Sequence, residues 1–184
     1  MAIPDKTRKE TVDDLNQKAA RFSPGSSYYY GFLIPGTFLG YSSLRIANKT
    51  PDDVLIITIE INPQSAEIAH NIHQHAAVGN RIHIIVDSTD KAIPRLHDQF
   101  NVDAFDFIFI DHYKELYLSD FKLLEQEGLI KTGTTIVADN VICPGAPDYL
   151  AYVRNNPQYS SVLHETTLEY RNDVPDGVEI SIRL

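Results

Sequence analysis

Two segments share a design that limits the possible folds: an apolar, strand-forming run that ends in residues with side-chain oxygens. Residues 106–111 read Asp-Phe-Ile-Phe-Ile-Asp, and residues 134–140 read Thr-Thr-Ile-Val-Ala-Asp-Asn. Runs of this kind are typical of parallel strands that are buried on both faces. In an open α/β sheet the carboxyl ends of the strands form the ligand-binding edge. The pattern therefore predicts that Asp111, Asp139 and Asn140 meet at one site.

Three oxygen-bearing side chains at one point suit a hard divalent cation such as Mg2+. A single acid at a strand end more often caps the helix or loop that follows it. Two neighbouring strand ends, with Lys114 three residues beyond Asp111, favour a binding site over capping alone.

The same alternation of strand and helix continues along the chain. Further apolar runs predict three more strands, at 28–34, 54–60 and 81–86. Helices are expected at 44–48, after Asn62, after Ser88, at 117–126 and at 148–155. Alternating segments at 160–170 and 177–184 predict a C-terminal hairpin with its turn at 172–177. We therefore predict an α/β fold with a doubly wound, mostly parallel, seven-stranded sheet and an antiparallel C-terminal hairpin.

Composition fits an ordinary soluble protein. With 184 residues, 43% of them hydrophobic, the chain can bury one substantial core, so we expect a polar tail at 1–27 and a single domain at 28–184. The net charge of −9 argues against nucleic acid and acidic membranes as partners. Cys143 is the only cysteine, which fits a reducing compartment. Residues 1–21 carry no apolar run, so we expect neither a signal peptide nor a membrane span, and a cytoplasmic location.

The first predicted strand runs into a turn that contains Gly36 and Gly40, where the backbone can approach a ligand closely. Glu60 ends the next strand 20 residues beyond Gly40, and a carboxylate there can pair with both hydroxyls of a ribose. The turn alone is as typical of a plain strand-to-helix connection as of a cofactor site. Because it lacks a third glycine at the usual spacing, it disfavours a nicotinamide-dependent oxidoreductase.

Two other polar features have alternative interpretations. Ser88 follows the third strand, where it either caps the next helix or contacts the edge of an adenine. His70, His73 and His75 suggest a metal site, but their spacing does not place all three on one helix face. We therefore expect these histidines to be solvated or half-buried.

Three motifs resemble the catechol O-methyltransferase family, in the same order and at matching spacing. They are Ile59-Glu60-Ile61-Asn62-Pro63, Phe109-Ile110-Asp111-His112-Tyr113-Lys114, and the segment 138–154, which begins Ala-Asp-Asn-Val-Ile-Cys-Pro-Gly-Ala-Pro. The similarity extends from about Leu33 to the C-terminus, and the third motif is the most specific. It implies the class I methyltransferase fold, which agrees with the sheet predicted above, and S-adenosylmethionine as the methyl donor.

The resemblance also implies a reaction: Mg2+-dependent transfer of a methyl group from S-adenosylmethionine to one hydroxyl of a catechol-type substrate. Lys114 would be the general base, and Glu169 would hydrogen-bond the second hydroxyl. The implied metal ligands are Asp111, Asp139 and Asn140, and Asn140 and Pro144 would also contact the acceptor. The implied donor contacts are Gly36, Phe38, Ser42, Glu60, Ile61, Ser88, Asp111, His112 and Tyr113, with the adenine ring between Ile61 and Tyr113.

The sequence departs from the family's pattern in the donor half of the site. About 30 unrelated residues precede the glycine turn, where the family has a helical region. Ile34 replaces an acid two residues before the first glycine, and Ser88-Thr89 lacks an amide side chain at its second position. Two expectations follow: a transferase acting on a small catechol or related diphenol, which the depleted donor half could weaken, or a catalytically silent, truncated paralogue that keeps the fold and the metal site.

Overall fold

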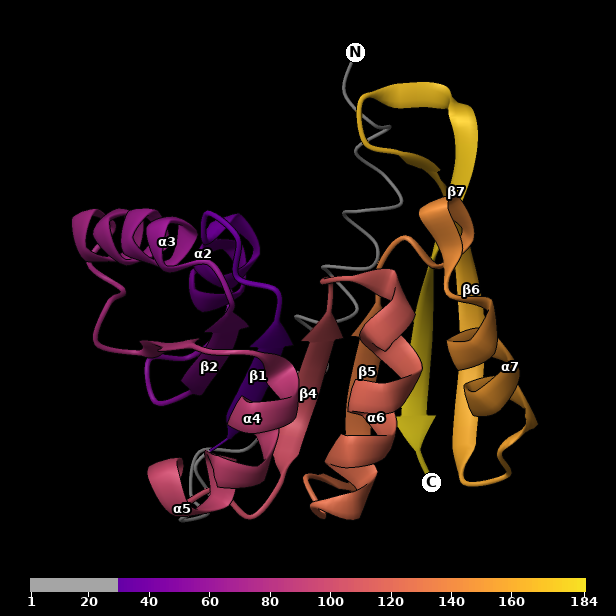
Figure 1. Cartoon of the computed structure of the whole chain (residues 1–184), viewed down its shortest axis with the longest axis horizontal. Coiled ribbons are helices and arrows are strands. Elements are labelled where there is room, and N and C mark those ends of the chain that lie inside the picture. The colour runs from indigo at the N-terminus through magenta and orange to yellow at the C-terminus, as the bar shows by residue number, and fades with distance from the viewer. Residues whose placement is uncertain (1–29) are drawn as a thin grey trace.

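The computed structural model describes residues 30–184. The tail expected at 1–27, together with the first two residues of the strand expected at 28–34, lies outside the described residues. Seven strands form one sheet in the order β3-β2-β1-β4-β5-β7-β6 (Figure 1). Their bounds are β1 Gly31–Pro35, β2 Leu55–Glu60, β3 Ile82–Val86, β4 Phe105–Ile110, β5 Ile130–Ala138, β6 Tyr159–Leu168 and β7 Arg171–Arg183.

Strands β1 to β5 pair in parallel, and β7 lies antiparallel between β5 and β6. The predicted doubly wound sheet with an antiparallel C-terminal hairpin is therefore confirmed. Strand β1 is at the centre of the parallel part of the sheet, and all five of its residues are buried, as is typical of a strand covered on both faces.

Helices flank the sheet in two groups (Figure 1). Their bounds are α2 Tyr41–Ala47, α3 Pro63–His75, α4 Thr89–Ala92, α5 Leu96–Phe100, α6 Tyr117–Gln126 and α7 Pro147–Asn155. One core cluster packs residues of α4 to α7 against the sheet, and its largest buried side chains include Tyr117, Phe121 and Tyr149. A second cluster contains Ala47 of α2 and Val78, which follows α3.

The start of α3 and the end of α4 agree with the predicted signals. The Asn62 side chain accepts hydrogen bonds from the backbone N–H groups of Gln64 and Ser65, and Pro63 is the first helical residue. Helix α4 ends at Ala92, before a 3-10 turn that contains Pro94.

The predicted turn of the C-terminal hairpin is wrong. Strands β6 and β7 are joined at Glu169 and Tyr170, and Tyr170 has the left-handed φ of 62° that a tight reversal requires. Residues 172–177 belong to β7, where the register shifts so that Thr167 pairs with Pro175 and Leu168 pairs with Arg171. The turn-forming residues therefore mark an irregularity inside a strand, because bulges and turns favour the same residue types.

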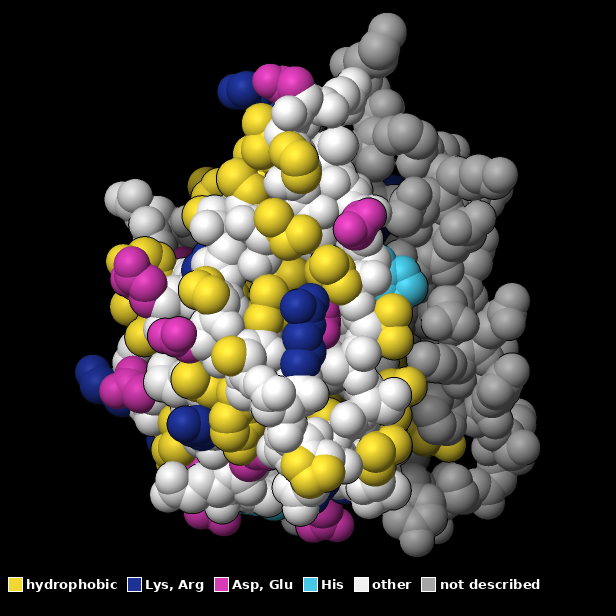
Figure 2. All heavy atoms as spheres, turned by 90° about the vertical axis from the view of Figure 1, so that its right-hand side faces the viewer, with side chains coloured by type: hydrophobic (Ala, Val, Ile, Leu, Met, Phe, Trp, Pro, Cys, Tyr) yellow, Lys and Arg dark blue, Asp and Glu magenta, His cyan; other side chains and the backbone are white. Residues whose placement is uncertain are grey.

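The surface on the side of β6 and α7 carries small groups of hydrophobic side chains among polar ones (Figure 2). Charged side chains of the described residues are scattered there and do not form a basic patch. Within residues 30–184, the helices are all too short or too polar to cross a lipid bilayer.

Candidate active site

The carboxyl ends of β4 and β5 bring the predicted oxygen donors together. Ile110 pairs with Ala138 in the parallel ladder, so the acids that follow them, Asp111 and Asp139, leave the sheet side by side. The Lys114 Nζ lies 3.1 Å from Asp111 Oδ1 and 3.2 Å from Asn140 Oδ1. Two of the three predicted ligand oxygens therefore face one point, which the lysine ammonium contacts.

Tyr117 hydrogen-bonds this lysine, and the sequence analysis did not identify it as a site residue. Its fully buried hydroxyl accepts a hydrogen bond from Lys114 Nζ and lies 2.9 Å from the carbonyl oxygen of Ile110 and 3.0 Å from that of Asp139. Burial, with the nearby Asp111 and Asp139 carboxylates, raises the pKa of Tyr117, so the phenol stays neutral. The signal that could have found it is its spacing three residues after Lys114, at the start of a helical segment.

The electrostatics of Asp111 also place Glu169 in this region. Burial raises the pKa of Asp111, the Lys114 ammonium opposes that shift, and the Glu169 carboxylate adds to it. Glu169 is exposed at the hairpin turn, yet near enough for its charge to act on Asp111.

The donor chemistry of this cluster fits a hard cation. Among residues 30–184, there is no group of three His, Cys, Asp or Glu side chains arranged for a metal ion. The predicted set differs from such a group because its third member is an amide. Asp111 and Asn140 already direct oxygens at one cation, while Asp139 Oδ1 accepts a hydrogen bond from the Asn140 backbone N–H at 2.9 Å. Carboxylate and amide oxygens are the ligands that Mg2+ prefers.

The glycine turn packs directly against this site. Gly36 has a φ of 100°, and a Cβ there would lie 2.3 Å from the carbonyl oxygen of Asp111, so only glycine fits. Glu60 braces the turn from β2: Oε2 accepts from the Phe38 N–H at 2.7 Å, and Oε1 accepts from the Asn62 N–H at 2.8 Å. Glu60 therefore links the turn to the start of α3.

The other predicted donor contacts follow the carboxyl ends of β1, β2, β3 and β4 with different degrees of exposure. Phe38, Ile61 and Tyr113 are 69%, 72% and 63% exposed, so three large apolar surfaces are open to a ligand. Ser42 is half-buried in α2. Ser88 occupies the N-cap position of α4, but its side chain makes no capping hydrogen bond within the described part of the chain.

His112 has a buried nitrogen that suits the predicted adenine contact. Its Nε2 lies 2.7 Å from Asp120 Oδ2, and its ring stacks on Tyr117. Because a carboxylate only accepts, Nε2 carries the proton. In the neutral ring Nδ1 is then an acceptor, and it has no hydrogen-bond partner among residues 30–184. An amino group of a ligand would satisfy it.

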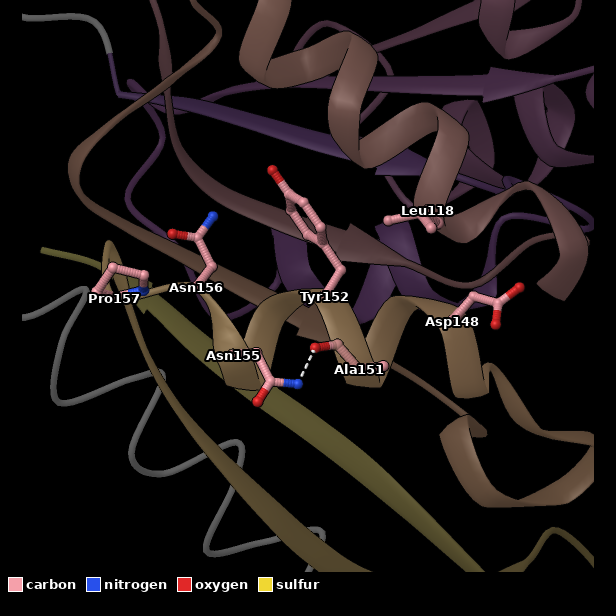
Figure 3. Close-up of a pocket in the computed structure, with 7 residues that line it drawn as sticks. All are labelled: Leu118, Asp148, Ala151, Tyr152, Asn155, Asn156 and Pro157. Carbon is pink, nitrogen blue, oxygen red and sulfur yellow. Dashed lines mark hydrogen bonds between the residues drawn. The ribbon is translucent and has the colours of Figure 1, made fainter.

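Pro144 lies in a single turn, Val141–Gly145, that follows the oxygen donors of β5. It is exposed and therefore accessible to an acceptor. A separate groove of about 610 Å³ is lined by residues of α6, of α7 and of the segment after α7 (Figure 3). The predicted site residues are not among those that line it, which are Leu118, Asp148, Ala151, Tyr152, Asn155, Asn156 and Pro157.

The chain is similar to O-methyltransferases in sequence and in structure. Residues 32–166 match a family profile described as O-methyltransferase. The chain belongs to this family. Catechol O-methyltransferase B of Danio rerio is 43% identical over 149 residues, which are 81% of this chain and 56% of that protein. Catechol O-methyltransferase of Sus scrofa is 40% identical over 147 residues, which are 80% of this chain and 78% of that protein.

These relatives confirm the resemblance to the catechol O-methyltransferase family, although the matched part spans little more than half of the zebrafish protein. Among solved structures, the O-methyltransferase from Bacillus cereus in complex with SAH has a TM-score of 0.75 at 20% identity, covering 99% of this chain and 93% of that one. TomG from Streptomyces achromogenes in complex with SAM has a TM-score of 0.74 at 20% identity, covering 100% and 92%. These likenesses confirm the class I methyltransferase fold.

His73 corrects the expectation that all three histidines of α3 are solvated or half-buried. It is 1% exposed, and its Nε2 lies 2.9 Å from Ser43 Oγ and 3.2 Å from the Gly40 carbonyl oxygen. A Cβ on Gly40 would lie 2.6 Å from that nitrogen, so the ring packs against the glycine turn. His70 and His75 are exposed. The sequence could not single out His73 because Ser43 lies 30 residues away.

We predict that His73 makes folding sensitive to mild acid. Burial lowers the pKa of His73 below its ordinary value of 6.5. As the pH decreases below 6.5, the unfolded chain binds a proton that the folded chain does not. The free energy of unfolding therefore decreases as the pH decreases, by up to about 1.4 kcal/mol per pH unit. Urea unfolding at pH 7.5 and 5.5 measures this. His73→Leu should reduce the change in unfolding free energy between the two pH values, and His75→Leu, at an exposed position, should keep it. An equal change in the parent and both variants would contradict the prediction.

Proposed function

We propose that this chain transfers a methyl group from S-adenosylmethionine to one hydroxyl of a catechol-type substrate in a Mg2+-dependent reaction. The observation that carries the proposal is the convergence of Asp111 and Asn140 oxygens on Lys114 Nζ, beside a glycine turn braced by Glu60. Relatives named catechol O-methyltransferase support the choice of acceptor.

Asp111, Asp139 and Asn140 would hold Mg2+. When bound there, Mg2+ supplies positive charge beside both catechol oxygens and lowers the pKa of one hydroxyl. S-Adenosylmethionine supplies the methyl group as an electrophile. The residues of this chain then bind, orient and deprotonate the acceptor, and positioning provides most of the acceleration.

Lys114, in its neutral form, accepts the hydroxyl proton at Nζ. Its environment orients it for that task, because the Tyr117 hydroxyl and the Asp111 and Asn140 oxygens surround one amine with acceptors. A neutral amine has two N–H groups to donate among these three acceptors, and its lone pair is then available for the hydroxyl proton. Glu169 accepts a hydrogen bond from the second hydroxyl, and Pro144 flanks the aromatic ring.

Glu60 binds the ribose of the donor. Its two oxygens each accept one backbone N–H, which leaves further lone pairs for the ribose hydroxyls. Ile61 and Tyr113 enclose the adenine between exposed apolar surfaces, and His112 Nδ1 accepts from it. These roles assign the donor to the carboxyl ends of β2, β1 and β4, which are neighbours in the sheet.

The competing proposal is a catalytically silent paralogue that keeps the fold and metal site. Ile34 favours it, because this fully buried apolar residue stands where the family has an acid. Calorimetric titration with S-adenosylmethionine separates the two. Saturable heat at submillimolar donor supports the transferase, whereas the silent paralogue predicts neither heat nor saturation at millimolar donor.

Glu60→Ala should weaken donor binding by roughly 1–3 kcal/mol, since it removes the hydrogen-bonding partner of two buried hydroxyls. Mg2+ affinity should not change, because Glu60 lies on β2 and the metal ligands follow β4 and β5. Titrations with S-adenosylmethionine and with Mg2+ measure both constants. Glu67→Ala removes an exposed acid of α3 and serves as the control. An unchanged donor dissociation constant would show that Glu60 only braces the turn.

Lys114→Met should slow single-turnover methylation of a catechol by about 100-fold or more, the scale of a positioned general base. Methionine keeps much of the apolar stem, so Mg2+ and substrate affinities should stay within a few-fold. Lys91→Met, at an exposed position of α4, is the control and should keep the parent's rate. Equal rates in the parent and in Lys114→Met would remove Lys114 from the mechanism.

A further inference from the structure

Asp176 is a buried carboxylate to which the proposed function gives no role. It is 1% exposed and lies on β7, paired with Thr166 of β6. Burying a carboxylate is costly unless hydrogen bonds satisfy its oxygens. The partners of Asp176 therefore explain what this acid does in the fold.

Those partners all belong to the segment that follows β5. Asp176 Oδ2 accepts from Asn140 Nδ2 at 2.7 Å. Oδ1 accepts from the backbone N–H of Cys143 at 3.0 Å and, more weakly, from that of Ile142 at 3.4 Å. One acid of the C-terminal hairpin thus fixes both the Asn140 side chain and the turn that carries Pro144.

The two neighbours of the Asn140 amide determine its orientation. A carboxylate only accepts hydrogen bonds, so the amide NH2 must face Asp176. A lysine ammonium only donates, so the amide oxygen must face Lys114, whose Nζ lies 3.2 Å from it. Both requirements select the same rotamer, with the oxygen toward the strand-end cluster. Asn140 also has a left-handed φ of 52°, a conformation that asparagine tolerates better than most residues.

Gly177 of β7 allows the turn Val141–Gly145 to pack closely against this strand. A Cβ at this position would lie 2.7 Å from Leu163 Cδ1 and 3.0 Å from Ile142 Cδ1. The absence of a side chain therefore leaves room for Ile142 next to the Asp176 hydrogen bonds. Asp176 therefore hydrogen-bonds the turn Val141–Gly145, and Gly177 packs against it.

We propose that Asp176 is a positioning residue that holds the Asn140 amide with its oxygen toward Lys114 and Asp111. This inference rests on the proposed function for its effect on the metal and the acceptor, but not for the amide orientation. Without the carboxylate the amide can rotate and present its NH2 group to a cation, which repels it. The turn with Pro144 also loses the acceptor of two backbone N–H groups.

The amide orientation can be tested in the parent by NMR. The Asn140 side-chain NH2 signals, assigned by their loss in Asn140→Asp, should exchange with water at least about 10-fold more slowly than those of exposed Asn80. In Asp176→Asn this protection should be lost, because the new amide no longer offers two accepting oxygens. Fast exchange of Asn140 in the parent would overturn the proposal whether or not the variant folds.

The functional arm measures Mg2+ by titration. Asp176→Asn should weaken Mg2+ binding by about 10-fold, the scale for disturbing a group that orients a ligand, while S-adenosylmethionine binds within a few-fold of the parent. Asp173→Asn makes the same charge change at an exposed position of β7 and should leave both affinities unchanged. Unchanged Mg2+ affinity in a folded Asp176→Asn protein would overturn the positioning role. If the parent binds neither Mg2+ nor donor, the proposed function fails, and the exchange rates still decide the amide orientation.

Discussion

The contact between Lys114 and the oxygens at the ends of β4 and β5 is the interaction on which the rest of the site depends. Parallel pairing of these strands brings Asp111 and Asn140 close enough to share one ammonium group. Each charged or polar group there would be costly to bury alone, and together they satisfy one another. The fold thus concentrates donors and acceptors at one edge, where the proposed catechol and Mg2+ would be bound.

A set of partners from distant parts of the chain supports this contact. The Tyr117 hydroxyl accepts a hydrogen bond from Lys114, and Asp176 accepts one from the amide NH2 of Asn140, whose oxygen faces the lysine. Asp111 links the cluster to the donor side, since its carbonyl group lies where only Gly36 can approach. The glycine turn and the strand-end cluster therefore share one piece of backbone, which in the proposed reaction would couple the position of the methyl group to that of the hydroxyl.

The sheet, the strand ends and the Asn62 cap could be predicted because each depends on a local pattern or on a general rule for parallel sheets. The C-terminal hairpin shows the limit of that reasoning, because residues that favour a turn also favour a bulge. Asp176 lay in that misassigned segment, and its partner Asn140 is 36 residues away. His73 was missed for the same reason: its burial depends on Ser43 and Gly40, which only the folded chain brings to α3.

The most direct test of the account is methyl transfer itself, with a two-hydroxyl and a one-hydroxyl acceptor compared. The protein is incubated with S-adenosylmethionine labelled in its methyl group and with either a catechol or the matching monophenol, in Mg2+ or in excess EDTA, and products are identified by mass spectrometry. The account predicts one labelled methyl group on the catechol in Mg2+, and little product from the monophenol or in EDTA. Absence of labelled catechol, or equal product in Mg2+ and EDTA, would contradict it.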